Sequence, residues 1–240
     1  MRTYLRLLFI PVHQNFDYDY PIVTTLWDLP TFLSLLLHVG LILAALRLYR
    51  NYRMIFFGIL WFYITLSVES SVVPIRDVIF EHRLYLPMFG FVLACSCFLF
   101  ILVQNPRNFS IVLSFLVLIL AAMTYVRNDV WKDELTLWSD VIQKSPNKVR
   151  GYNNLAILFG ERGDADKELE YLQKSIQMVP SDSRVLFNLG TAYGKRGELE
   201  KEMAYYEKAI QADPSYIKPY FNLATAYAEM GNLDKTIELL

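Results

Sequence analysis

The second half of the chain repeats itself every 34 residues. A proline, a glycine and a short motif recur at this step: Pro146, Pro180 and Pro214; Gly163, Gly197 and Gly231; and NNLA, FNLG and FNLA, which begin at Asn153, Phe187 and Phe221. Glycine permits the left-handed conformation of a tight turn, and proline ends a helix. Each unit is therefore expected to hold two helices, and stacked units cover one another's apolar faces in an all-α solenoid.

A period of 34 residues with this pattern is typical of tetratricopeptide repeats. Full repeats are expected at 149–182 and 183–216, and a third, truncated repeat at 217–240. The stretch 127–148 is expected to be a linker that includes one helix of a partial repeat, ELTLWSDVIQK. Because no polar capping helix follows the third repeat, the chain is expected to be truncated at its carboxyl end.

The first half is apolar, and a transmembrane domain is predicted over 31–126. About 20 residues of helix are needed to cross a bilayer. Four apolar runs approach that length: 31–49, 54–73, 86–103 and 109–126. These runs are apolar on every face, which favours about four transmembrane helices over a water-soluble helical core. Cys95 and Cys97 fall inside the third run and are interpreted as small packing residues.

Arginines in the short connecting loops predict how these helices are oriented. The stretch between the first two runs carries three arginines, and the loop before the fourth run carries one more: Arg47, Arg50, Arg53 and Arg107. By the positive-inside rule, both loops are cytoplasmic. Residues 1–30 are then an extracytoplasmic loop or interfacial segment, and both termini and the repeats are also extracytoplasmic. A bacterial inner membrane is the expected location.

Composition and motifs argue against several classes of function. The net charge is −1, which gives no electrostatic reason to expect a nucleic acid partner. The sequence holds no phosphate-cradling glycine loop, no zinc-binding HExxH and no nucleophile elbow. No metal site and no bound cofactor are therefore predicted.

The main candidate for chemistry is the segment EHRLYLP, which includes Glu81, His82, Arg83 and Tyr85. These side chains are expected at the depth of lipid headgroups. Arginine or histidine there could hold a lipid phosphate, and Glu81 could orient the arginine. The competing interpretation is an interfacial anchor, because charged residues and tyrosine commonly mark the end of a membrane helix.

Three further candidates are expected on the same side of the membrane. Asp17 and Asp19 alternate with aromatic residues, a pattern that suits sugar binding but also an ordinary interfacial loop. Glu69 lies near the outer end of the second run, and a carboxylate in a membrane is costly and often functional. His38 is expected to form a hydrogen bond between helices rather than to bind a ligand.

On the repeats, Asn154, Asn188 and Asn222 recur at the same 34-residue step. Solenoids of this kind use an extended concave surface for binding. The three asparagines are therefore candidates for a groove that binds a partner protein or peptide. The alternative is that they satisfy nearby backbone groups.

Several segments resemble the transmembrane and tetratricopeptide repeat-containing (TMTC-like) O-mannosyltransferases and their bacterial relatives, in the carboxyl-terminal portion of those proteins. The segments are YLRLLFIPVHQNFDYDYP, EHRLYLP and RNDVWKDELTLWSDVIQKSPNKVRGYNNLA. The resemblance spans essentially the whole chain. It implies a glycosyltransferase of the GT-C fold that passes a sugar from polyprenyl phosphate, its co-substrate, to a protein hydroxyl, with the repeats binding the acceptor.

The resemblance also implies roles for particular residues. Glu81 and Arg83 match the donor-side segment of the family. Family members carry further spans, and their catalytic acid lies in the first outer loop, a role that Asp17 or Asp19 does not simply inherit. The chain is therefore expected to be a fragment without that acid. The expected partners are membrane lipid, the lipid-linked sugar and a protein; the alternative function is a non-catalytic, membrane-anchored scaffold.

Overall fold

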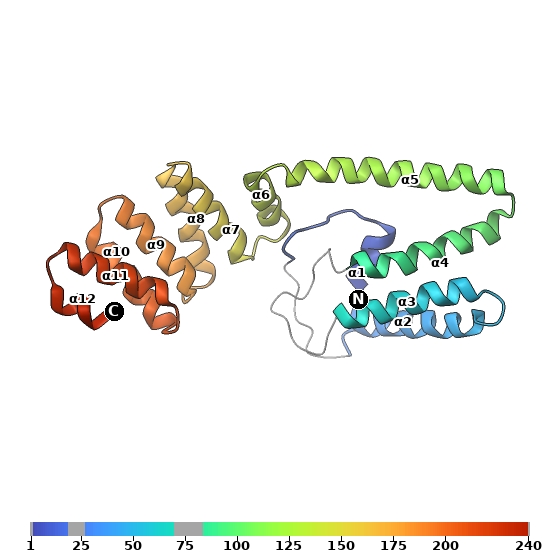
Figure 1. The fold of residues 1–240 in the computed structure, drawn as a ribbon, viewed down its shortest axis with the longest axis horizontal. Helices are drawn as coiled ribbons and strands as arrows, with labels where there is room; N and C mark the ends of the chain where they lie inside the picture. The colour runs from blue at the N-terminus through green and yellow to red at the C-terminus, as the bar shows by residue number, and fades with distance from the viewer. Residues whose placement is uncertain (1, 19–26, 70–83, 240) are drawn as a thin grey trace. The chain divides into compact units, whose positions relative to one another are not determined.

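The computed structural model describes all residues except 1, 19–26, 70–83 and 240, and the described residues form helices and no strands (Figure 1). The chain divides into two compact units, Met1–Trp131 and Lys132–Leu240. The first contains the apolar runs, and the second contains the repeats. The predicted all-α fold class is thereby confirmed.

The first unit holds five α-helices within its described residues. They are α1 (Arg2–Phe9), α2 (Leu29–Leu48), α3 (Arg53–Glu69), α4 (Tyr85–Val103) and α5 (Pro106–Asn128), and a short 3-10 helix, η2 (Asp129–Trp131), follows. Three helical stretches are long and apolar enough to cross a membrane: α2, α4 and Pro106–Trp131. The helix α3, where the second of the four spans was expected, is a shorter apolar helix in the described residues. These helices are compatible with a membrane protein.

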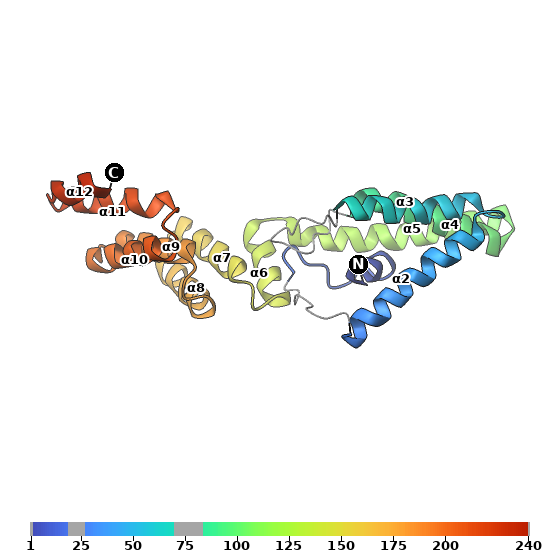
Figure 2. The same ribbon diagram turned by 90° about the horizontal axis from the view of Figure 1, so that it is seen from below.

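Local sequence explains where these helices begin. The carboxylate of Asp28 accepts a hydrogen bond from the amide of Thr31 at 3.3 Å, which satisfies a free donor at the start of α2. The side chain of Asn105 caps α5 in the same way, and Pro106 occupies the first turn, where proline is well tolerated. The α2–α3 and α4–α5 loops are short and lie at the same end of the unit (Figures 1 and 2).

Two glycines let α3 and α4 pack closely. A Cβ atom on Gly58 would lie 2.5 Å from the carbonyl oxygen of Gly90, and a Cβ atom on Gly90 would overlap the carbonyl oxygen of Gly58. Small residues that allow backbones to approach are the usual means by which membrane helices associate. The indole nitrogen of Trp61 also donates to the carbonyl oxygen of Leu86 at 3.0 Å, which ties the two helices further.

A polar contact joins α2 to α3. The Nδ1 atom of His38 lies 2.8 Å from the hydroxyl oxygen of Tyr63. The expected hydrogen bond between helices at His38 is thereby confirmed. Cys95 and Cys97 are free and half-buried on α4.

The second unit is a stack of helix pairs. After α6 (Glu134–Lys144), three pairs follow: α7 (Val149–Glu161) with α8 (Ala165–Met178), α9 (Ser183–Lys195) with α10 (Leu199–Ala212), and α11 (Ile217–Glu229) with α12 (Leu233–Leu239). The first helices of successive pairs begin 34 residues apart. The expected left-handed turn glycines are present, with φ of 79° at Gly163, 72° at Gly197 and 75° at Gly231.

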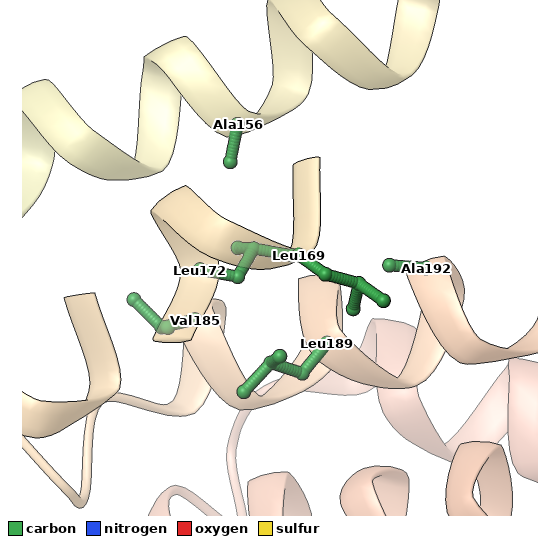
Figure 3. Close-up of a cluster of buried hydrophobic side chains, with 6 residues drawn as sticks. All are labelled: Ala156, Leu169, Leu172, Val185, Leu189 and Ala192. Atoms are coloured by element: carbon green, nitrogen blue, oxygen red, sulfur yellow. The ribbon is translucent and has the colours of Figure 1, made fainter. Parts of the chain in front are cut away.

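Each pair is covered by the next one. One apolar cluster joins α7, α8 and α9 through Ala156, Leu169, Leu172, Val185, Leu189 and Ala192 (Figure 3). Leu172 and Leu189 are both 1% exposed, and burying a leucine side chain contributes about 1.5–3 kcal/mol. The apolar faces of the first repeat are thus closed by its neighbour, as a solenoid requires.

Candidate functional site

The candidates expected at the lipid headgroups are only partly described by the structure. Glu81, His82, Arg83 and Asp19 lie outside the described residues. Tyr85 begins α4 and is 77% exposed, and Glu69 is the last residue of α3. The functional roles of these residues stay predictions.

Asp17 lies in a compact turn and is buried, with 3% of its surface exposed. The side-chain nitrogen of Asn15 donates to the carbonyl oxygen of Asp17 at 3.0 Å, and the amide of Asp17 donates back to Asn15 Oδ1 at 3.4 Å. The hydroxyl of Tyr18 accepts from the amide of Asn15 at 3.1 Å. Asp17 therefore helps to shape this turn, while a role in sugar binding stays a prediction.

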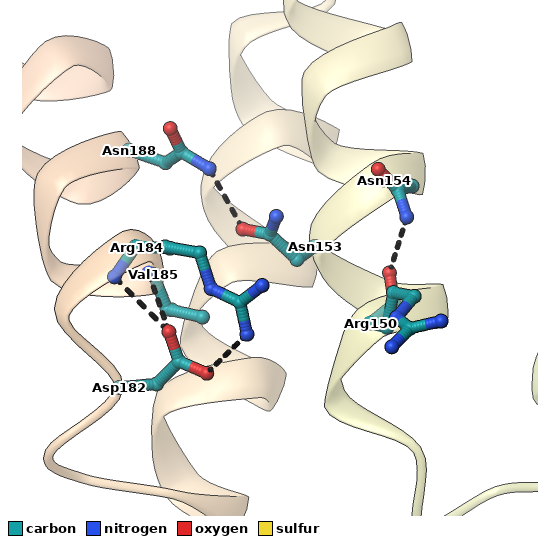
Figure 4. A network of polar contacts seen from close by, with 7 residues as sticks. All are labelled: Arg150, Asn153, Asn154, Asp182, Arg184, Val185 and Asn188. Carbon is teal, nitrogen blue, oxygen red and sulfur yellow. Dashed lines mark hydrogen bonds and ion pairs between the residues drawn. The ribbon is translucent and has the colours of Figure 1, made fainter. Parts of the chain in front are cut away.

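The three asparagines of the repeats are half-buried, and their side-chain amide nitrogens have three different kinds of partner. Asn154 donates to the carbonyl oxygen of Arg150, on its own helix, at 2.9 Å (Figure 4). Asn188 donates at 2.8 Å to Asn153 Oδ1 in the preceding repeat (Figure 4). The third, Asn222, donates at 3.1 Å to the hydroxyl of a tyrosine on α10, Tyr206.

The alternative that asparagine satisfies a backbone group thus holds for Asn154. Asn188 and Asn222 instead connect one repeat to the repeat before it. Sequence periodicity could not separate these roles, because the three residues share a position in the repeat but face different neighbours. A role of this row in binding a partner stays a prediction.

A row of cations precedes the asparagines and was missed by the sequence analysis. Arg150, Arg184 and Lys218 each stand four residues before an asparagine, which is about one turn earlier on the same helix. Arg184 Nη2 lies 3.4 Å from the Asp182 carboxylate, whose other oxygen caps α9 (Figure 4). The 34-residue step could have revealed this row. Amides beside cations suit a polar or acidic peptide.

Replacing Asn188 with alanine is expected to weaken the packing of the first two repeats by about 1 kcal/mol, because Asn153 loses a hydrogen-bond donor. Asn154→Ala is expected to be nearly neutral, since it removes a bond within one helix and adds a better helix former. Denaturant unfolding of both variants measures the difference. Equal destabilisation would contradict these assignments.

A buried carboxylate lies between the first and second repeats. Glu168 is 5% exposed and packs against Gly160, where a Cβ atom would overlap the carboxylate. Its Oε1 atom lies 2.8 Å from the Nζ atom of Lys195 on α9. The glycine makes room for the carboxylate, and the lysine neutralises it.

The equivalent position between the second and third repeats is different. Glu202 packs against Gly194 just as Glu168 packs against Gly160. Glu229 occupies the position equivalent to Lys195, so this junction holds two carboxylates in place of an ion pair. Burial, with a smaller contribution from the negative charge of Glu229, raises the pKa of Glu202, although a hydrogen bond from Tyr206 opposes the shift.

Comparison with known proteins agrees with both halves of the chain. Tetratricopeptide repeat models match residues 183–216 and 205–238. The protein O-mannosyl-transferase F38B6.6 of Caenorhabditis elegans is 31% identical over 168 residues, which are 67% of this chain and 24% of that protein. The chain thus spans about a quarter of the length of this relative.

Solved structures with a similar arrangement of helices have low identity to the chain. The structure of MamA from Desulfovibrio magneticus RS-1 is 19% identical and covers 76% of this chain and 90% of its own, with a TM-score of 0.39. An O-GlcNAc transferase of Thermobaculum terrenum is 21% identical and covers 42% of this chain and 20% of its own, with a TM-score of 0.37. From the sequence matches, the predicted resemblance is confirmed: the chain carries tetratricopeptide repeats and is similar to the TMTC-like protein O-mannosyltransferases.

Proposed function

We propose that the chain is part of a membrane-bound GT-C-type glycosyltransferase, which passes a sugar from a polyprenyl-phosphate donor to a protein. The observation that carries the proposal is the 31% identity to a protein O-mannosyl-transferase across 67% of the chain. Three apolar helices of membrane-spanning length support it, because a donor with a polyprenyl tail resides in the membrane. The repeats supply a surface for the acceptor protein.

The proposed orientation places the donor site outside the cytoplasm. The arginine-bearing loops lie at one end of the first unit, where α4 finishes at Val103. Tyr85 begins α4 and therefore lies at the opposite end of this helix. If the arginines face the cytoplasm, EHRLYLP faces the other side, and an even number of spans puts both termini and the repeats there as well. A bacterial inner membrane remains the proposed location.

The donor-site proposal is tested at Arg83. In the full-length protein, Arg83→Ala is expected to lower transfer of mannose from polyprenyl-phosphate mannose to protein at least tenfold, because a charged contact to the donor phosphate is lost. Membranes incubated with radiolabelled donor give the measurement. Arg107→Ala removes an arginine from the opposite end and serves as the control.

Unchanged transfer by Arg83→Ala would remove this residue from the donor site. Absence of transfer by the unmodified full-length protein would instead favour the non-catalytic scaffold, in which the repeats bind a partner and no sugar moves.

The acceptor-binding proposal is tested at Asn154, because its recorded hydrogen bond stays within α7 and does not join repeats. Asn154→Ala is expected to weaken binding of the acceptor about fivefold, which corresponds to one lost hydrogen bond of about 1 kcal/mol. Binding of the purified acceptor to the immobilised protein measures this effect. Asn147→Ala, in the loop before α7, is the control. Equal affinity of both variants would contradict a role for the asparagine row.

A further inference from the structure

An open cavity of about 710 Å³ lies at the arginine-bearing end of the first unit. It is lined from the α2–α3 loop, the start of α3, the end of α4 and the start of α5. A volume of this size falls in the range of sites that bind small molecules. Nothing in the proposed sugar transfer uses this end of the unit.

The rim of the cavity is positively charged. Arg50 and Arg53 both line it, and both side chains are exposed. Within the described part of the chain, neither guanidinium group forms an ion pair, and no acidic residue lines the cavity. Arg53 also begins α3, so the positive end of the helix dipole adds to the same potential. Two arginines without acidic partners favour a ligand that carries a phosphate.

The walls of the cavity are apolar. Ile55, Cys97, Phe100 and Phe109 contribute to them. The rings of Phe100 and Phe109 meet edge to face with their centres 5.3 Å apart, which gives a rigid wall between α4 and α5. Phe100 is 48% exposed, although it lies on a helix of membrane-spanning length. A hydrocarbon chain is the natural cover for such a wall.

We propose that this cavity binds an anionic phospholipid of the adjoining leaflet. The lipid phosphate lies between Arg50 and Arg53, and an acyl chain lies along Phe100 and its apolar neighbours. A free phosphate ion would use only the arginines, whereas a lipid also covers the apolar walls. This inference depends on the membrane location in the proposed function and is independent of sugar transfer.

The test measures lipids that stay bound to the full chain. The protein is reconstituted in nanodiscs of phosphatidylcholine with one phosphatidylglycerol in ten lipids and then moved to detergent, and retained lipids are counted by native mass spectrometry. Wild-type protein is expected to retain phosphatidylglycerol in preference to phosphatidylcholine. The double variant Arg50→Gln/Arg53→Gln is expected to retain at least fivefold less.

A matched control removes the same charge from the same end of the unit. Arg47 and Arg107 flank the cavity in sequence but do not line it. Arg47→Gln/Arg107→Gln is therefore expected to retain phosphatidylglycerol within twofold of wild type. Equal losses in the two double variants would overturn the proposal, because they would indicate general attraction to a positive surface.

A third variant tests the apolar walls. Cys97→Phe narrows the cavity while both rim arginines remain, and it is expected to lose most of the retained phosphatidylglycerol. Retention at the wild-type level would overturn the proposal. Glycerol phosphate, which lacks acyl chains, is expected not to displace the lipid, and full displacement would indicate a site for free phosphate instead. Sugar transfer is measured separately, so failure of the lipid site leaves the proposed enzyme activity untouched.

Discussion

Replacing Gly90 with alanine is expected to destabilise the first unit by about 1–3 kcal/mol, the usual cost of overpacking a close contact. An added Cβ atom would overlap the carbonyl oxygen of Gly58 and lie 2.9 Å from the amide nitrogen of Phe62. Both are backbone atoms, so no side-chain rotation relieves the overlap. The helices α3 and α4 would have to separate, and packing along the whole crossing would loosen.

The same substitution at Gly40 is the control. This glycine lies on α2, and a Cβ atom there would meet nothing within 4 Å. Alanine in place of glycine stabilises an exposed helix by up to about 1 kcal/mol, so Gly40→Ala is expected to be neutral or stabilising. Both variants gain the same helix propensity, and their difference isolates the crossing.

Thermal unfolding in detergent measures this difference. Trp61 is a useful reporter, because its ring lies 2.9 Å from the position of a Cβ atom on Gly90. Gly90→Ala is expected to lower the midpoint by several degrees and to change the tryptophan emission of the native state. Equal midpoints for Gly90→Ala and Gly40→Ala would show that α3 and α4 are not held together by this contact.

The crossing illustrates what the sequence could not predict. Apolar runs indicate which segments become helices, but residues that are apolar on every face do not indicate which face meets which neighbour. Gly58 and Gly90 have no periodic relation, and their contact depends on how two helices pack in space. Length is a further limit: the run expected at 54–73 is described as helix only to Glu69.

In the repeats, much more was predictable, because the same local solution recurs. Gly163, Gly197 and Gly231 indicated the turns, and all three have positive φ. What periodicity could not show is where equivalent positions have different partners. Asn154 bonds its own helix and Asn188 bonds another repeat, although the two residues are equivalent in sequence.

The two repeat junctions should respond in opposite directions to an exchange of charge. Glu229→Lys is expected to stabilise the docking of the third repeat by about 1 kcal/mol, because a lysine can then pair with Glu202 as Lys195 pairs with Glu168. Lys195→Glu is expected to destabilise the docking of the second repeat by about 3 kcal/mol, because Glu168 is buried and would lose its counter-ion.

Hydrogen exchange on the full chain measures both effects locally. Amides of α11 are expected to exchange more slowly in Glu229→Lys, and amides of α9 are expected to exchange faster in Lys195→Glu. Glu200→Lys makes the same charge change at an exposed position of α10 and is expected to alter neither. If Glu200→Lys protected α11 as strongly as Glu229→Lys, net charge rather than pairing would explain the result.

The dependence on pH provides an independent check of the same junction. The folded state raises the pKa of Glu202, mainly through burial, so the folded state holds this proton more tightly than the unfolded chain does. The docking of the third repeat is therefore most stable at low pH and loses stability as pH rises from the ordinary range of glutamate through the raised pKa. A lysine at position 229 favours the ionised form of Glu202, which lowers its pKa and should reduce or reverse this loss. Protection of α11 that fell equally with rising pH in wild type and in Glu229→Lys would mean that Glu202 does not sense the residue at position 229.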